Sequence, residues 1–545
     1  MPRDSGSSTR CRPRRCRPRR PARSGRARAG GAACTCRRTR RRRRSRRNEV
    51  LVLRTARSVR PDPQPFRLLH DGIDVAGAYR IATNKTPRTT RRALSALSRR
   101  RLLHHTAPAL PRSVLPNDTS SAIGTAAANR RALSVLALCA GLNLIARGIG
   151  ETFAIFLLPI AREFGADRAA LTGVYSTYML TLGLLSPLAG FAHDRFGPRL
   201  GYGAGLLLFG TACALAGAMT ALWQLYLLVG IAGAVGSALI GAVPASSLVS
   251  RWFRARLPSA MSVLATALGS GMLVFAPATQ WLIDHLGWRG AYHAFAVLLL
   301  ALFVPMMLLP WRRIAAGAPD VVAAAAAAQR TSGGRDWTIA RALRTGVFWA
   351  LFGVIFLTSI TTYAISVQLV AYLIESGITP LRAASIFGAV GMVSIVGMMG
   401  SGVLAQRFGE RAVATVSYTG TIAGIGVLAL LQAGPSTTLI GVFLLLFGTM
   451  QGTRGPLVAV LTARNFAGGG MGRVYGSVLL GMGTGAAIGS WASGTLYDLT
   501  GGYRAGFLLA AAAAACGLLL FWTVNGLSGA SGRSASGVPR VSDRS

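Results

Sequence analysis

The 545-residue sequence contains few acidic residues, few histidines and few cysteines. Only 17 Asp and Glu stand against 60 Lys and Arg, and there are 6 His and 7 Cys. The His and Cys residues form no cluster with metal-ligand spacing. The sequence also has no phosphate-binding glycine loop and no nucleophile elbow with triad partners. We therefore expect no enzyme activity, no cofactor and no bound metal.

The N-terminal segment, residues 1–125, has little apolar sequence. Residues 1–120 hold 33 of the 60 Lys and Arg but only 6 of the 17 acidic residues. This segment has no apolar run of the kind found in secretory signals, and too few large apolar residues to build a core. We expect a disordered extension. The alternative interpretation is a basic arm that binds nucleic acid or anionic lipid, but no nucleic-acid-binding module is recognisable and no nucleic acid partner is expected.

From Arg131 onward the chain alternates between long apolar runs and short basic loops. Twelve runs are each close to the ~20 residues that a bilayer core requires. Such runs must be helical, because lipid offers no partner to unpaired backbone groups. The predicted spans are 133–160, 169–191, 200–220, 222–249, 258–284, 289–310, 346–374, 380–405, 412–432, 437–463, 472–497 and 503–525. The lipid bilayer is thus an expected partner.

A short charged turn joins the second and third spans, and a second copy of it joins the eighth and ninth spans. The first copy contains Gly190, Asp194, Arg195, Gly197 and Arg199. The second copy, which begins at Gly402, keeps both glycines and Arg407 at a constant offset from the first, and has Gln406 in place of the acid. Two further segments repeat at nearly the same offset, including Asp284 with Asp498. The membrane region is therefore a duplication.

The turn resembles the signature loop of the major facilitator superfamily, Gly-x-x-x-Asp-Arg/Lys-x-Gly-Arg-Arg/Lys, although Pro198 stands where that family usually has Arg. The resemblance covers roughly residues 130–526. It implies an all-α membrane protein with twelve transmembrane helices in two pseudo-symmetric six-helix bundles and a substrate site between them. It also implies a conformational role for the signature-loop residues. The expected domains are an extension (1–125), an N-terminal bundle (126–310), a linker (311–345), a C-terminal bundle (346–526) and a disordered tail (527–545).

Arginine placement predicts the orientation. One set of alternating loops carries fifteen Arg and the opposite set carries five. Because basic loops stay in the cytoplasm, we expect both termini there, in a multi-pass protein of the inner (plasma) membrane that acts as a monomer.

Three ionisable residues fall well inside predicted spans. Arg147 and Glu151 are four residues apart in the first span, and Arg454 lies in the tenth. A lone Arg at a helix centre costs roughly 2.5–3.5 kcal/mol, so each must face protein or a water-filled cavity. The resemblance implies that the first, fourth, seventh and tenth helices line the central cavity. In one interpretation, Arg147 and Arg454 bind an anionic substrate from opposite halves. In the other, Arg147 pairs with Glu151, and Arg454 donates to neighbouring backbone carbonyls. Glu151 is either a proton carrier or a fixed partner of Arg147.

Neutral polar residues in the same spans and in the seventh are further candidates for substrate contact. Asn143 and Gln451 share spans with the two arginines. The offset of the signature turn places Ser359 opposite Arg147 and Tyr363 opposite Glu151. The alternative role of these polar residues is to bond their own helix backbone.

The predicted function is secondary transport of a small organic anion by alternating access, coupled to a proton or to exchange. The Phe153–Pro159 stretch and the Gly287-Trp288-Arg289 turn resemble the monocarboxylate and oxalate–formate branch, which implies a carboxylate. This hypothesis requires both arginines to reach one chamber. A drug or general metabolite exporter is the alternative within transport, although the glycines of the drug-antiporter signature are missing around Pro277. Retained transport after deletion of residues 1–120 would exclude a role for the basic extension.

Overall fold

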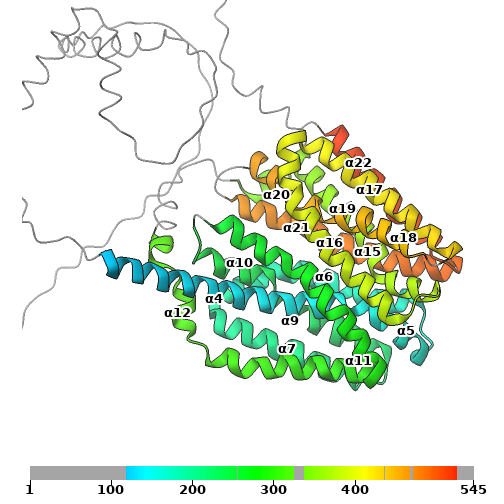
Figure 1. Cartoon of the computed structure of the whole chain (residues 1–545), viewed down its shortest axis with the longest axis horizontal. Helices are drawn as coiled ribbons and strands as arrows, with labels where there is room; N and C mark the ends of the chain where they lie inside the picture. Colours follow the sequence, from blue (N-terminus) through cyan, green and yellow to red (C-terminus); the bar gives the residue numbers. More distant parts are fainter. Residues whose placement is uncertain (1–117, 255, 324–336, 435, 467–469, 525–545) are drawn as a thin grey trace, which may run out of the picture. The chain divides into compact units, whose positions relative to one another are not determined.

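The computed structural model of the protein describes residues 118–254, 256–323, 337–434, 436–466 and 470–524. Helices make up nearly all of these residues (Figure 1). The first helix begins at Asp118, inside the segment expected to be an extension. The rest of that extension, residues 324–336 of the predicted linker and the predicted C-terminal tail lie outside the described residues.

The N-terminal half of the described chain contains six crossings and a short helix after the sixth. Its elements are α4 (Asp118–Glu151), α5 (Phe153–Phe164), α6 (Arg168–Phe196), α7 (Pro198–Gly217), α8 (Leu222–Leu225), η2 (Tyr226–Gly233), α9 (Ala234–Ile240), α10 (Ala242–Ser250), α11 (Leu257–Leu308) and α12 (Trp311–Ala316). The pair α4–α5 forms the first crossing and the run α8–α10 forms the fourth.

The C-terminal half repeats this arrangement. Its elements are α14 (Ile339–Ala342), α15 (Gly346–Glu375), α16 (Pro380–Phe408), α17 (Glu410–Leu430), η3 (Leu431–Ala433), α18 (Thr437–Phe443), η4 (Leu444–Gly448), α19 (Thr449–Gly452), α20 (Arg454–Asn465), α21 (Met471–Thr500) and α22 (Arg504–Thr523). The run α18–α20 forms the tenth crossing.

Ten helices of the described chain are long and apolar enough to cross a membrane, and two observations raise the number of crossings to twelve. First, α11 is two helices joined at Gly287, whose φ of 71° is not helical. The rings of Phe275 and Phe295 are 6.1 Å apart, whereas twenty residues of straight helix span about 30 Å, so the chain turns back on itself. Second, α21 has 30 residues but is rich in glycine, which lowers its hydropathy. The predicted all-α fold with twelve crossings is confirmed.

Both copies of the signature turn use their second glycine in the same way. Gly197 and Gly409 have φ values of 83° and 85°, a region that side chains with a Cβ disfavour. Each glycine ends one crossing and lets the next helix begin at the following residue. The turns therefore need glycine at this position whatever else they do.

The two halves bury separate apolar cores. One cluster is built mainly from residues of α4 to α12, and two others mainly from residues of α14 to α22. In Figure 1 the helices of the two halves gather in two groups, with α6 and α11 of the first beside α15, α16 and α21 of the second. The halves approach closely where Gly183 of α6 faces Gly483 of α21, since a Cβ on either glycine would meet the other's backbone.

Candidate functional site

The α-helical hydrogen bonding is interrupted at single residues in the first, fourth and tenth crossings, and of these residues Gly241 has non-helical backbone angles. The α4 helix ends at Glu151 and α5 begins after Thr152, whose backbone N–H and hydroxyl both donate to the Ile149 carbonyl. The fourth crossing is interrupted at Gly241, and the tenth is interrupted at Thr453, the position equivalent to Gly241 in the duplication. Broken helices in transporters commonly mark substrate sites, because the interruption frees backbone groups at mid-membrane.

Arg147 and Glu151 meet at the interruption in the first crossing. Their Nη2 and Oε1 atoms are 2.7 Å apart, and the spacing of four residues places both on one face of α4. The Arg147 side chain is 12% exposed and that of Glu151 is 4% exposed. The arginine is therefore less deeply buried than its acidic partner.

Two tyrosines, one from each half, bind the Glu151 carboxylate. Tyr175 of α6 donates its hydroxyl to Oε2 at 2.6 Å, and Tyr363 of α15 donates to Oε1 at 3.4 Å. The two tyrosine rings lie 6.1 Å apart. The pseudo-symmetric spacing places Tyr363 opposite Glu151, but nothing in the sequence singled out Tyr175. Glu151 thus links the two halves at the centre of the molecule.

Asn143 completes this group, which we call the Arg147 site: Asn143, Arg147, Glu151, Tyr175 and Tyr363. Asn143 lies one turn before Arg147 and donates to the Leu264 carbonyl of α11 at 3.0 Å, while its own Oδ1 is buried without a partner. It thus carries a buried acceptor without a partner, one helical turn from Arg147 along α4.

Arg454 is held away from the Arg147 site. Its side chain is completely buried, its Nε donates to the Ser417 hydroxyl at 3.0 Å, and its Nη2 donates to the Thr421 hydroxyl. Its guanidinium also lies over the Tyr418 ring, 4.5 Å from the centroid. All three partners belong to α17. The contacts of Arg454 therefore do not bring the two arginines to one chamber, as the two-arginine form of the hypothesis requires, and the proposal below rests on Arg147 alone.

The other predicted contacts are less defined. Ser359 is buried on α15, one helical turn before Tyr363 and on the same face. Gln451 lies on α19, and its Oε1 is buried without a partner. The structure thus brings Ser359 to the face of α15 that carries Tyr363, and it does not place Gln451 in the Arg147 site.

The signature loop lies far from the Arg147 site along the helices, at the end of the molecule that we call the Asp194 end. Asp194 pairs with Arg251, which follows α10 in the same half, at 3.2 Å. Arg251 also donates to the Ala315 carbonyl of α12. Arg195, Arg199 and Arg407 are exposed. Through Arg251, Asp194 thus connects the signature loop to the end of the fourth crossing and to the segment after the sixth.

The opposite end of the molecule, here called the Glu375 end, carries polar contacts between the halves. Arg168 at the start of α6 forms an ion pair with Glu375 at the end of α15. Asp498 of α21 accepts the backbone N–H groups of Arg168 and Ala169 at 3.0 and 2.7 Å. Over the described ranges, the hydrogen bonds that join the halves are these and that of Tyr363. Polar contacts therefore join the halves at the Glu375 end, and sequence reasoning missed them because they depend on how the halves meet.

The family description Major Facilitator Superfamily matches residues 136–478. This is more than half of the chain, and the protein therefore belongs to the Major Facilitator Superfamily of transporters, as predicted; it is a multi-pass membrane transporter and not an enzyme.

Several relatives resemble this chain in sequence. Monocarboxylate transporter 13 of Bos taurus is 28% identical over 67% of this chain and 82% of its own. Monocarboxylate transporter 12 of Rattus norvegicus is 25% identical, covering 69% and 81%. An uncharacterized MFS-type transporter of Bacillus subtilis, YcxA, is 23% identical, covering 65% and 85%. Among solved structures, the E. coli xylose transporter XylE in a partially occluded inward open conformation has a TM-score of 0.57 and 12% identity, over 72% of this chain and 98% of its own. That likeness supports the fold.

Proposed function

We propose that this transporter carries a small organic anion, a monocarboxylate or a similar carboxylate, with Arg147 as the group that binds it. The observation that carries the proposal is an arginine inside the first crossing that is 12% exposed and is paired with the buried Glu151. The names of the mammalian relatives, monocarboxylate transporters, support the same class of cargo.

The arrangement of Arg147 suits a carboxylate. Glu151 takes Nη2, and a guanidinium has five N–H donors in a planar fork. The remaining edge can bind a second carboxylate through two parallel hydrogen bonds, which are stronger than those between neutral groups. Asn143, one turn away, offers its free Oδ1 to a donor group on the cargo.

The charges of the site favour coupling to a proton. Arg147 and Glu151 together are neutral, so a bound carboxylate adds one negative charge in a region shielded from water. One proton taken up by Glu151, which Tyr175 and Tyr363 also contact, restores neutrality. We therefore propose symport of one proton with each monocarboxylate, or exchange of two carboxylates when the proton is retained.

The proposed orientation follows the arginine distribution. The Asp194 end carries the basic loops and faces the cytoplasm with both termini, and the Glu375 end faces outward. Since the polar contacts between the halves lie at the Glu375 end, we assign the structure to a state that faces the cytoplasm. We further propose a monomeric protein of the plasma membrane.

Uptake by purified protein in liposomes tests the proposal. The wild type is given radiolabelled acetate, lactate, pyruvate, oxalate and benzoate, with an inward proton gradient and without one. We expect uptake of at least one monocarboxylate and a loss of at least tenfold in Arg147→Gln, because one charged bidentate contact contributes about 1.5–3 kcal/mol.

The matched control is Arg162→Gln, which removes the same charge from an exposed position on the neighbouring helix α5. It should transport like the wild type. Unchanged carboxylate uptake by Arg147→Gln, or no uptake of any of these anions by the wild type, would overturn the proposal.

A further inference from the structure

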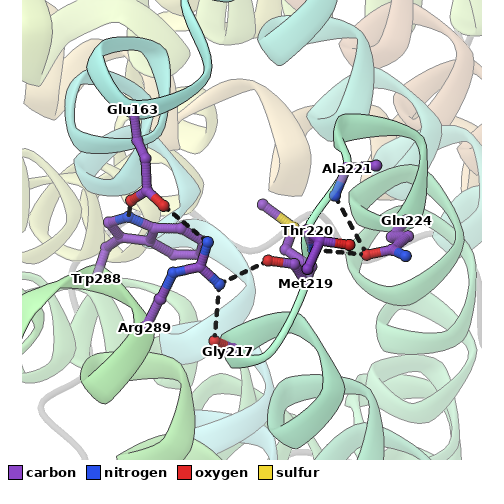
Figure 2. A network of polar contacts seen from close by, with 8 residues as sticks. All are labelled: Glu163, Gly217, Met219, Thr220, Ala221, Gln224, Trp288 and Arg289. Carbon is purple, nitrogen blue, oxygen red and sulfur yellow. Dashed lines mark hydrogen bonds and ion pairs between the residues drawn. The ribbon is translucent and has the colours of Figure 1, made fainter.

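Each half of the molecule ends its first crossing with a glutamate that accepts a hydrogen bond from an aromatic residue. In the N-terminal half, Trp288 Nε1 donates to Oε2 of Glu163 (Figure 2). In the C-terminal half, Tyr503 Oη donates to Oε2 of Glu375 at 2.7 Å. The offset of the signature turn carries Glu163 onto Glu375, and the neighbouring repeat aligns Trp288 with Tyr503, so these are equivalent positions of the duplication.

The two glutamates differ in the cation that binds their second oxygen. Glu163 Oε1 takes Nη2 of Arg289 at 2.7 Å, from its own half. The same arginine donates through Nη1 to the carbonyls of Gly217 and Met219, and Figure 2 shows it between the ends of three crossings. The contacts of Arg289 therefore hold the ends of helices together within one bundle.

Glu375 instead binds a cation from the other half. Its Oε1 binds Arg168 of α6, although its own half supplies Arg504, which follows Tyr503 as Arg289 follows Trp288. Arg504 is exposed and forms no ion pair with any residue that the structure describes. The equivalent arginine is thus present and unused.

The start of α16 explains why this contact exists on one side only. The residue equivalent to Arg168 in the C-terminal half is Pro380, which has neither a charge nor a backbone N–H. Asp498 accordingly caps α6 across the interface, whereas its equivalent Asp284 accepts from Gln280 on its own helix. The polar contacts across this end therefore converge on the first turn of α6.

We propose that Glu375 exchanges its cation during the transport cycle, from Arg168 when the Glu375 end is closed to Arg504 when it is open. Opening moves Arg168 away with the N-terminal half. A carboxylate that is 36% exposed and still bound to Tyr503 then binds Arg504, as Glu163 binds Arg289. The exchange lowers the free-energy cost of opening, because breaking an ion pair without replacement leaves a partly buried charge unpaired.

Distances between spin labels test this exchange. Leu286→Cys and Leu499→Cys are exposed positions at the Glu375 end, one in each half. In a cysteine-free background in lipid nanodiscs, double electron–electron resonance gives the ratio of open to closed molecules. We expect Arg168→Gln to raise this ratio and Arg504→Gln to lower it, each by about two- to fivefold, the range of a partly exposed ion pair.

A second set of variants tests whether Arg504 acts through Glu375. With Glu375→Gln in place, Arg504→Gln should no longer change the ratio, since the arginine has lost the carboxylate it binds in the open state. Glu163→Gln, which alters the contact within one bundle, is the control and should leave the ratio unchanged. The proposal is overturned if Arg504→Gln has no effect when Glu375 is present, or has the same effect with and without Glu375. The measurement needs no substrate, so it can fail or succeed independently of the carboxylate proposal.

Discussion

Arg454 is the largest side chain that the described residues bury completely, and it has no acidic partner among them. Two hydroxyls and an aromatic face of α17 surround it, and its Nη1 has no partner. Arg147, in contrast, is partly accessible and paired with an acid four residues away. The two arginines therefore differ in what their removal should change.

Arg454→Gln should lower the thermal stability of the protein and leave substrate binding intact. The change removes hydrogen bonds from a charged donor to Ser417 and Thr421, which contribute roughly 1.5–3 kcal/mol each. We expect a clear fall in the melting temperature in detergent and a KM within about twofold of the wild type, where Arg147→Gln should show the reverse pattern. A raised KM with unchanged melting would place Arg454 in the substrate site after all.

The second signature turn lacks the acidic residue of the first, but it also forms an ion pair. Gln406 stands where the first turn has Asp194, and Arg464 lies in the last turn of α20, near the position equivalent to Arg251. Arg464 pairs with Glu410, the first residue of α17, which follows the turn at Gly409. An ion pair between the signature turn and the end of the fourth or tenth crossing is thus present in both halves.

The Arg147 site was partly predictable from individual residues. A spacing of four predicts the pair with Glu151, and the internal repeat places Tyr363 opposite that acid. Tyr175 carries no such signal, because its approach depends on the packing of α6 against α4. The direction of the Arg454 side chain was equally hidden, since hydropathy shows depth in the membrane but not which neighbouring helix a side chain faces.

At the level of helices, the predicted spans agree closely with the structure. The span predicted at 346–374 is α15, Gly346–Glu375, and that predicted at 380–405 is α16, Pro380–Phe408. The interruptions at Thr152 and Thr453 were not predicted, because neither position carries a Pro or another helix-breaking signal. The π-helical segments η2 and η4 lie in the equivalent fourth and tenth crossings. Hydropathy does not distinguish a π-helix from an α-helix, so these segments were not predicted either.

The contact between α6 and α21 depends on having no side chain at Gly183 and Gly483. A Cβ on either glycine would meet the backbone of the other helix, so Gly183→Val should force the two halves apart at this level. We expect the ratio of open to closed Glu375 ends to rise and uptake to fall at least tenfold. Gly476→Ala is the control, because it lies on the same α21 with open space around its Cβ. Normal uptake by Gly183→Val would show that the halves tolerate a wider spacing there.

At the scale of the whole molecule, the proposed orientation assigns each end to one side of the membrane. Arg162 lies at the Glu375 end and Arg313 follows the sixth crossing at the Asp194 end, and both are exposed. In intact cells, a membrane-impermeant maleimide should label Arg162→Cys and should label Arg313→Cys only after permeabilisation. Cysteine-free protein is the control. The opposite labelling pattern would invert the topology and make the described state one that faces outward.

The pairing of Arg147 with Glu151 has an electrical consequence for the unloaded carrier. Moving one elementary charge through the full membrane field involves about 2.3 kcal/mol per 100 mV. A centre whose two charges cancel 2.7 Å apart does no such work when the protein resets without cargo. The resetting step should therefore proceed at the same rate in polarised and depolarised cells.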